Sequence, residues 1–107
     1  MSDSIPVQII GMVWYERNHY DAIRAVMADG HKLPGTFHEW RMKAETGEKK
    51  FRRDGKIVVR VLIDPETFPG WCLARGLNID AQARNLFAAE VAKDKVMRSQ
   101  AEGDGLH

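Results

Sequence analysis

One short segment of the chain gathers side chains that are able to do chemistry. Residues 14–20 read Trp-Tyr-Glu-Arg-Asn-His-Tyr and follow an apolar run, and Asp64 and Trp71 follow a second apolar run. A carboxylate, a guanidinium and an imidazole together can move protons or hold a polar ligand. If the two runs form parallel strands, both sets lie at one edge of a sheet, where α/β domains bind ligands. The predicted ligand-binding residues are Tyr15, Glu16, Arg17, His19, Asp64 and Trp71.

The same residues also have a purely structural interpretation. Glu16 and Asn18 suit the start of a helix, and Trp14 and Tyr20 suit a hydrophobic core. The sequence favours this interpretation, because it contains no recognisable catalytic constellation around these residues. A small enzyme with its site at the strand ends remains an alternative. It would use Glu16, Arg17, His19 and Asp64, and it requires these side chains to lie within hydrogen-bonding reach of one another, directly or through one water.

Neither the histidines nor the cysteine forms a known chemical motif. No two of the four histidines are four residues apart, so none forms the helical pair that binds zinc. Cys72 has no cysteine partner for an internal disulfide and is expected to be a small buried hydrophobic side chain. Phosphate-binding and dinucleotide-binding glycine motifs are also missing from the sequence. We therefore predict no metal and no cofactor.

Positive charge is concentrated in the middle of the chain. Residues 39–60 carry eight Lys or Arg against four Asp or Glu, although the net charge of the whole chain is +1. Such a segment can contact phosphates, and Phe51 among its cations can stack on a base. The alternative is a solvated helix end with Phe51 turned inward, and its periodicity favours that alternative. The candidate nucleic-acid-binding residues are Arg41, Lys49, Lys50, Arg52 and Arg53.

The composition indicates one small folded domain. The chain has 107 residues, of which 44% are hydrophobic and 29% charged, and such a chain can form one core. Its first residues have no basic start and no long apolar run, so neither a secretory signal nor a membrane span is expected. Together with the lone cysteine, these features predict a cytoplasmic protein.

Two short apolar runs predict β-strands. The segments Ile5–Trp14 and Lys56–Asp64 are rich in β-branched residues and are of strand length. Apolar side chains fall on both faces of each segment, with Arg60 as the exception in the second. We expect each strand to be covered on both sides.

The strongest helical pattern covers residues 36–54. Thr36 and Glu39 have the spacing of a capping box at a helix start. Gly55 is placed to end the helix in a left-handed conformation. A hairpin that turns at Asp54-Gly55 is the alternative. Apolar residues recur at intervals of three and four along one face, at Phe37, Trp40, Ala44, Gly47 and Phe51.

Two shorter helices are predicted after the two strands. The first follows the polar cluster and runs to about Asp29, with Gly30 as a left-handed cap. The second begins at Asp64 as N-cap and ends at Gly76. Pro69 lies inside the second helix and is expected to restrict it to one or two turns.

A final helix begins at Asp80 and is predicted to run to about Met97. Beyond it, residues 99–107 lack periodicity and are expected to form a flexible tail, so that residues 1–98 make up the single globular domain. The residues expected to face the core are Ala83, Leu86, Phe87 and Val91.

The predicted order of elements is β-α-α-β-α-α, which indicates a small helix-rich α/β domain, with α+β as the alternative. Two strands alone make a marginal sheet, so we expect a second copy of the chain to extend it and form a homodimer. The expected function is that of a non-enzymatic binding module with a protein or small-molecule partner. Nucleic-acid binding through residues 41–60 and the small enzyme are the two alternatives.

Overall fold

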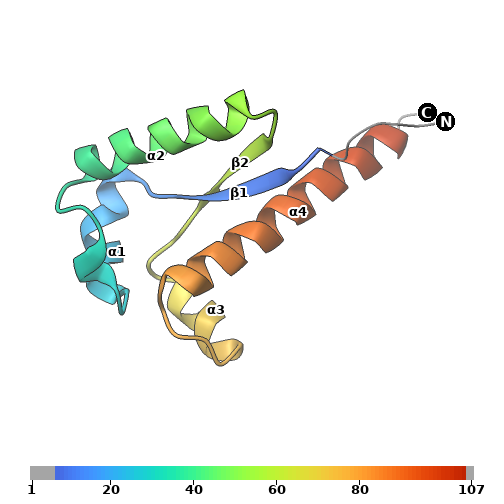
Figure 1. The fold of residues 1–107 in the computed structure, drawn as a ribbon. Helices are drawn as coiled ribbons and strands as arrows, with labels where there is room; N and C mark the ends of the chain where they lie inside the picture. The colour runs from blue at the N-terminus through green and yellow to red at the C-terminus, as the bar shows by residue number, and fades with distance from the viewer. Residues whose placement is uncertain (1–6, 106–107) are drawn as a thin grey trace.

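A two-stranded parallel sheet lies at the centre of the computed structural model, which describes residues 7–105 (Figure 1). Strand β1 (Ile9–Trp14) pairs with β2 (Ile57–Leu62), and each residue of β1 lies opposite the residue 48 positions later, from Ile9 opposite Ile57 to Trp14 opposite Leu62. The parallel direction is possible because the chain between the strands forms a long helical crossover.

Four α-helices and two short 3₁₀ helices accompany this sheet within residues 7–105. The 3₁₀ helix η1 and helix α1 follow β1, η2 and α2 complete the crossover, and α3 and α4 follow β2. These elements confirm the predicted α/β class. Their bounds are η1 Arg17–His19, α1 Tyr20–Val26, η2 Gly30–Lys32, α2 Phe37–Arg53, α3 Phe68–Ala74 and α4 Ala81–Gly105.

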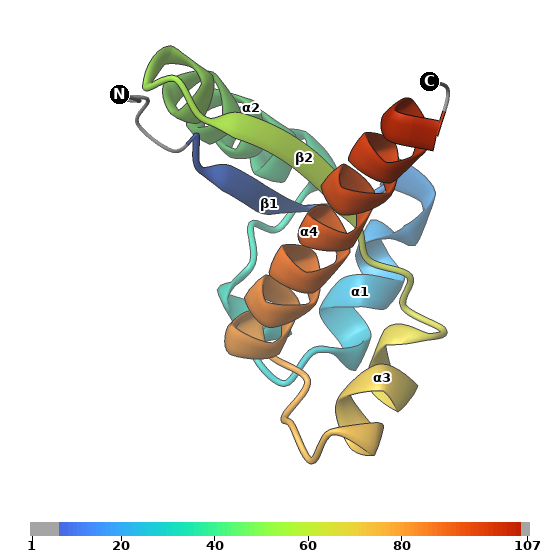
Figure 2. The same cartoon turned by 90° about the vertical axis from the view of Figure 1, so that its right-hand side faces the viewer.

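Helices cover both faces of the sheet, as the two-sided apolar strands predicted (Figure 2). On one face Trp14 meets Trp40 of α2, with ring centroids 5.0 Å apart. On the other face Val61 packs against Ala88 and Ala92 of α4. Because side chains alternate along a strand, consecutive residues of β1 and β2 contribute to the two cores in turn.

Helix α4 lies unusually close to β1 at one point. A Cβ atom built on Gly11 would be 2.1 Å from the carbonyl oxygen of Ala88, so only glycine fits at this position of the strand. The small side chains of Ala88 and Ala92 face the sheet at the same place and are almost completely buried. Small residues on both elements thus let the backbone of the helix contact the strand directly.

Aromatic rings fill the core beyond the ends of the strands. Trp14, Tyr15 and Tyr20 pack around Trp40 of α2, and the Tyr20 hydroxyl donates a hydrogen bond to the Pro34 carbonyl. A second group joins α3 to α4 through the rings of Phe68, Trp71 and Phe87. Cys72 is buried beside this group, as predicted, and burial raises the pKa of its thiol.

The ends of α2 and the start of α4 agree with the sequence patterns. The Thr36 hydroxyl accepts a hydrogen bond from the Glu39 amide, and the Asp80 carboxylate accepts one from the Ala83 amide. Gly55 ends α2 with a positive φ of 83°. The single helix from Phe37 to Arg53 excludes the alternative hairpin, and the same kind of glycine, Gly76, follows α3.

The first helix after β1 is shorter than predicted, because α1 ends at Val26. Gly30 does not form the predicted left-handed cap, and it begins η2 without a positive φ. A Cβ atom at Gly30 would be 1.9 Å from the Arg24 carbonyl oxygen, so glycine is required here for close backbone contact. The first strand also begins later than predicted, at Ile9, and residues 5 and 6 of that prediction lie outside the described residues.

The last two helices differ from prediction at their ends. A turn after Asp64 comes before α3, so Pro69 lies in the first turn of the helix, where its missing N–H costs nothing. Helix α4 continues past Met97 to Gly105, and residues 106 and 107 of the predicted tail lie outside the described residues. Leu86 is exposed, whereas the prediction placed it in the core. None of the helices within residues 7–105 is long and apolar enough to cross a membrane.

Candidate functional site

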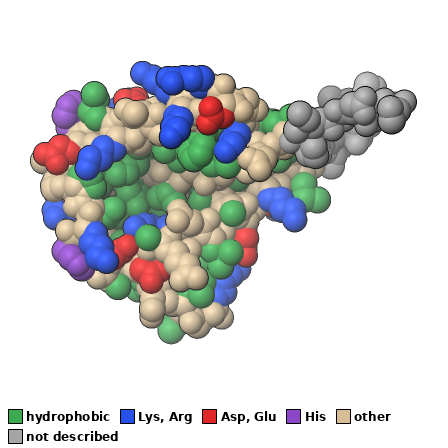
Figure 3. Space-filling view, in the orientation of Figure 1, with side chains coloured by type: hydrophobic (Ala, Val, Ile, Leu, Met, Phe, Trp, Pro, Cys, Tyr) green, Lys and Arg blue, Asp and Glu red, His purple; other side chains and the backbone are tan. Residues whose placement is uncertain are grey.

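Parallel pairing brings the carboxyl ends of both strands to one edge of the sheet. The Ile63 amide donates a hydrogen bond to the Trp14 carbonyl at 3.1 Å, so the strand register continues past the last paired residues. Glu16 and Asp64 therefore follow closely after the ends of two neighbouring strands. Below α2 in Figure 3 the surface is hollowed and apolar side chains are exposed in the hollow.

The first predicted ligand-binding residue, Tyr15, is part of the core. Its ring centroid lies 4.8 Å from that of Trp40 and 5.9 Å from that of Tyr20. Burial disfavours the charged phenolate and raises the pKa of Tyr15 to about 12. The core interpretation of Trp14 and Tyr20 is confirmed, because both side chains are buried.

The other predicted ligand-binding residues lie apart in small local contacts. Among residues 7–105, Glu16 pairs only with His19, at 3.9 Å, and the Arg17 guanidinium lies 5.0 Å from the Phe37 ring centroid. The Asp64 carboxylate accepts a hydrogen bond from the Glu66 amide at 2.8 Å.

Trp71 is farther along, in α3, where it packs against Phe68 and Phe87 with the Arg75 guanidinium 4.1 Å from its ring. Within residues 7–105, no hydrogen bond or ion pair joins the group at Glu16 and His19 to Asp64 or Trp71. The described residues also contain no group of three or more His, Cys, Asp or Glu side chains that could hold a metal ion.

Sequence reasoning missed a buried ion pair that connects distant parts of the chain. Asp29 precedes η2 and Arg84 lies in α4, and two hydrogen bonds of 2.8 and 3.2 Å join their side chains. Asp29 also accepts a hydrogen bond from the Ala81 amide at the start of α4. The hydrogen bonds from Arg84 lower the pKa of Asp29. The only sequence signal is an arginine beside the apolar positions of the last helix, and that signal does not identify its partner.

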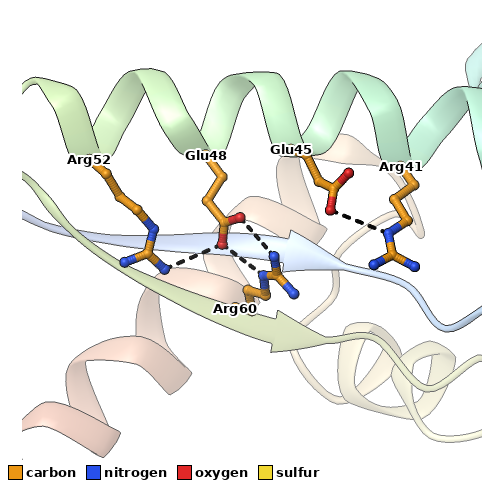
Figure 4. A network of polar contacts seen from close by, with 5 residues as sticks. All are labelled: Arg41, Glu45, Glu48, Arg52 and Arg60. Carbon is orange, nitrogen blue, oxygen red and sulfur yellow. Dashed lines mark hydrogen bonds and ion pairs between the residues drawn. The ribbon is translucent and has the colours of Figure 1, made fainter.

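A second network connects α2 to β2 (Figure 4). The buried carboxylate of Glu48 accepts two hydrogen bonds of 2.7 Å from Arg60 and a longer one of 3.4 Å from Arg52. The Arg60 guanidinium also lies 3.8 Å from the Trp14 ring centroid, which is a cation–π contact. Arg60, the polar exception in the predicted strand, thus covers the core on the α2 side.

The Glu48 network makes a testable contribution to stability. Hydrogen bonds from Arg60 lower the pKa of Glu48, so its contribution is present above the unfolded pKa and is lost as the pH falls through the lower folded pKa. We expect Glu48→Gln to reduce the free energy of unfolding at pH 7 by about 1–2 kcal/mol. Urea denaturation should show this difference shrinking below about pH 4.

Glu45→Gln is the matched control for this experiment. Glu45 lies on the same helix and pairs with Arg41 at 3.4 Å, but both side chains are substantially exposed. An exposed pair contributes little, so we expect a change within about 0.5 kcal/mol. Equal effects of the two substitutions at every pH would show that the burial of Glu48 has no energetic consequence.

The candidate nucleic-acid-binding residues fall into two groups on α2. Arg41 and Arg52 belong to the ion pairs drawn in Figure 4. In contrast, Lys49, Lys50 and Arg53 are exposed and form no ion pair with any carboxylate of the described residues. The structure thus distinguishes cations that are paired with a carboxylate from cations that are not. The positions of these residues in the sequence did not make this distinction.

Comparison with known proteins finds no protein family, no curated protein and no solved structure that matches this chain. The fold alone therefore defines the class of protein, which is an α/β domain with a two-stranded parallel sheet held between α2 and α4.

Proposed function

We propose that the protein is a homodimeric binding module, in which two copies join their sheets along β2. The observation that supports this proposal is the open margin of β2. The amides of Ile57 and Ile63 donate to β1, so the alternating pattern of a parallel ladder directs the main-chain N–H and C=O groups of Val58, Arg60 and Leu62 away from it. Within residues 7–105, no other strand pairs with these groups.

A second copy of β2 is a suitable partner for this margin. A two-fold axis perpendicular to the sheet places two β2 strands side by side in antiparallel orientation, and each then supplies the donors and acceptors that the other lacks. The result is a four-stranded sheet, which is far more stable than a two-stranded one.

Exposed apolar side chains at both ends of β2 support the same conclusion. Ile57 is 46% exposed and Leu62 is 51% exposed, and both are large aliphatic residues. Helix α4 packs more closely against β1 than against β2, so β2 is the less covered strand. Association along β2 would remove part of this apolar surface from water.

Sedimentation equilibrium of the wild type and of Leu62→Pro tests the proposal. The wild type should have twice the chain mass of 12.2 kDa. Proline at position 62 removes an N–H that faces away from β1, so the ladder within the chain is kept while pairing with a second copy is blocked. We expect Leu62→Pro to be a folded monomer, with its helical circular dichroism unchanged.

Ile9→Pro is the matched control at the margin of β1. The Gln8 and Trp14 carbonyls face β2, and the alternation of the ladder therefore directs the Ile9 amide to the outer side of β1. We expect this variant to remain a dimer. A monomeric wild type, or a monomeric Ile9→Pro together with a dimeric Leu62→Pro, would overturn association along β2.

A further inference from the structure

We propose that the outer face of α2 binds the phosphate backbone of a nucleic acid duplex. Lys49 and Arg53 follow the buried residues Trp40 and Ala44 by nine positions each. Nine residues are about two and a half helical turns, so the two cations lie opposite the face that packs on the sheet. Figure 3 shows Lys and Arg side chains gathered over α2.

The cations on one side of α2 are paired with carboxylates, and those on its other side are not. On the side nearest Arg60, the carboxylates of Glu45 and Glu48 neutralise Arg41 and Arg52. Away from this side, Lys43, Lys49, Lys50 and Arg53 are all exposed, and none is paired with a carboxylate of the described residues. Glu39, in the first turn of α2, is the one carboxylate of the helix on this other side, which therefore carries four cations against one carboxylate and can attract an anionic partner.

The spacing of the free cations suits an extended polyanion. Lys43 and Arg53 are ten residues apart, which corresponds to about 15 Å along the helix axis. A single small anion cannot contact cations over this length, whereas a nucleic acid strand presents successive phosphates. The aliphatic stems of lysine and arginine let their charged groups reach out to such phosphates.

The structure favours a duplex over a single strand. Binding of single strands depends on exposed aromatic rings on which bases stack. Phe51 is half-buried, and the Lys56 amine lies 5.3 Å from its ring centroid. The bases of a duplex are already stacked, so contacts with its backbone need no aromatic platform.

The structure also disfavours a membrane surface as the partner. A helix that binds in the lipid interface inserts an apolar face. The apolar face of α2 is packed on the sheet through Trp40 and Ala44. Along α2, which is described in full, Met42 is the one large apolar side chain that is exposed.

This inference does not depend on the dimer, although the proposed dimer would strengthen it. A two-fold axis perpendicular to the sheet leaves both α2 helices on the same face, so one dimer would present two sets of free cations. Binding of a duplex by a monomer would leave the inference intact and contradict only the proposed association along β2.

Fluorescence anisotropy with a labelled DNA duplex of mixed sequence tests the inference. For about four phosphate contacts, binding should weaken roughly 100-fold between about 50 and about 200 mM salt. The variant Lys49→Gln, Lys50→Gln, Arg53→Gln should reduce the slope of log affinity against log salt by about 3 per chain. Circular dichroism should show that this variant keeps its helices, because all three side chains are exposed.

A control variant of equal charge separates the face of α2 from the overall charge. Lys93→Gln, Lys95→Gln, Arg98→Gln removes three exposed cations from α4, on the opposite side of the sheet. It should keep the wild-type salt slope. Equal losses for both variants, or no duplex binding by the wild type at low salt, would overturn the inference, as would binding to anionic lipid vesicles without binding to the duplex.

Discussion

Gly11→Ala is expected to destabilise the protein by about 3 kcal/mol or more, at or above the top of the usual range for overpacking a core. The new methyl group would lie 2.1 Å from the Ala88 carbonyl oxygen and 2.6 Å from the carbonyl carbon. Both atoms belong to the backbone of α4, so no side-chain rotation can relieve the clash and the helix itself has to move. Thermal and urea denaturation should show the loss.

Gly47→Ala is the matched control for this substitution. Gly47 lies inside α2, and a Cβ atom there would meet only the end of the Met12 side chain, at an ordinary distance of 3.5 Å. Alanine has a higher helix propensity than glycine, so we expect a stabilisation of about 0.5–1 kcal/mol. If both substitutions raise stability, α4 does not contact β1 in the way described.

The close contact between α4 and β1 also helps to explain how a sheet of two strands is stabilised. Helix α4 buries one face of both strands at close range, and α2 covers the other face with the Trp14–Trp40 contact. Each strand therefore packs against a helix on both faces, although within residues 7–105 it has a partner strand on one side only. Within the described residues both margins of the sheet are unpaired, and we place the association of two chains at the margin of β2.

Local patterns in the sequence predicted the parts of the fold that local interactions determine. The long helix begins at Thr36 and ends before Gly55 because hydroxyl capping and a left-handed glycine act within a few residues. The β-branched run of the second strand forms β2 because branching at Cβ favours the extended backbone. The role of Gly30 was predicted incorrectly, because its requirement comes from contact with the Arg24 carbonyl and not from its own φ.

Contacts between distant residues were not predictable from the sequence. Glu48 lies in the charged segment 39–60 with nothing in the sequence to distinguish it, but Arg60 on β2 makes it a buried acceptor. Its place on the helix, one residue beyond the apolar Gly47, is compatible with either role. Tyr15 likewise has the residue type of a ligand contact and the position of a core side chain. In both cases the packing of helices against strands determines whether the side chain is buried. The periodicity of residues along one helix or strand does not predict that packing.

Removing the carboxylate of Asp29 is the second change with a large expected effect. Asp29→Ala leaves the Arg84 guanidinium without its partner in a site where the arginine side chain is 7% exposed. An unpaired buried charge of this kind costs about 3–5 kcal/mol, and the partial exposure of Asp29 places our expectation near the lower value. The Ala81 amide at the start of α4 also loses its acceptor. Urea denaturation at pH 7 measures the loss.

A double-mutant cycle with Arg84→Met distinguishes the ion pair from simple loss of packing. Methionine fills a similar volume without charge, so the double variant should recover part of the stability that Asp29→Ala loses. The pH dependence gives an independent reading. Because Arg84 lowers the pKa of Asp29, the stabilisation by this carboxylate is present above the unfolded pKa, near 4, and is lost as the pH falls through the lower folded value. The wild type and Asp29→Ala should therefore approach one another in stability at low pH. The two side chains are not energetically coupled if the effects of the two substitutions on the free energy of unfolding are strictly additive and the stability difference between the wild type and Asp29→Ala does not depend on pH.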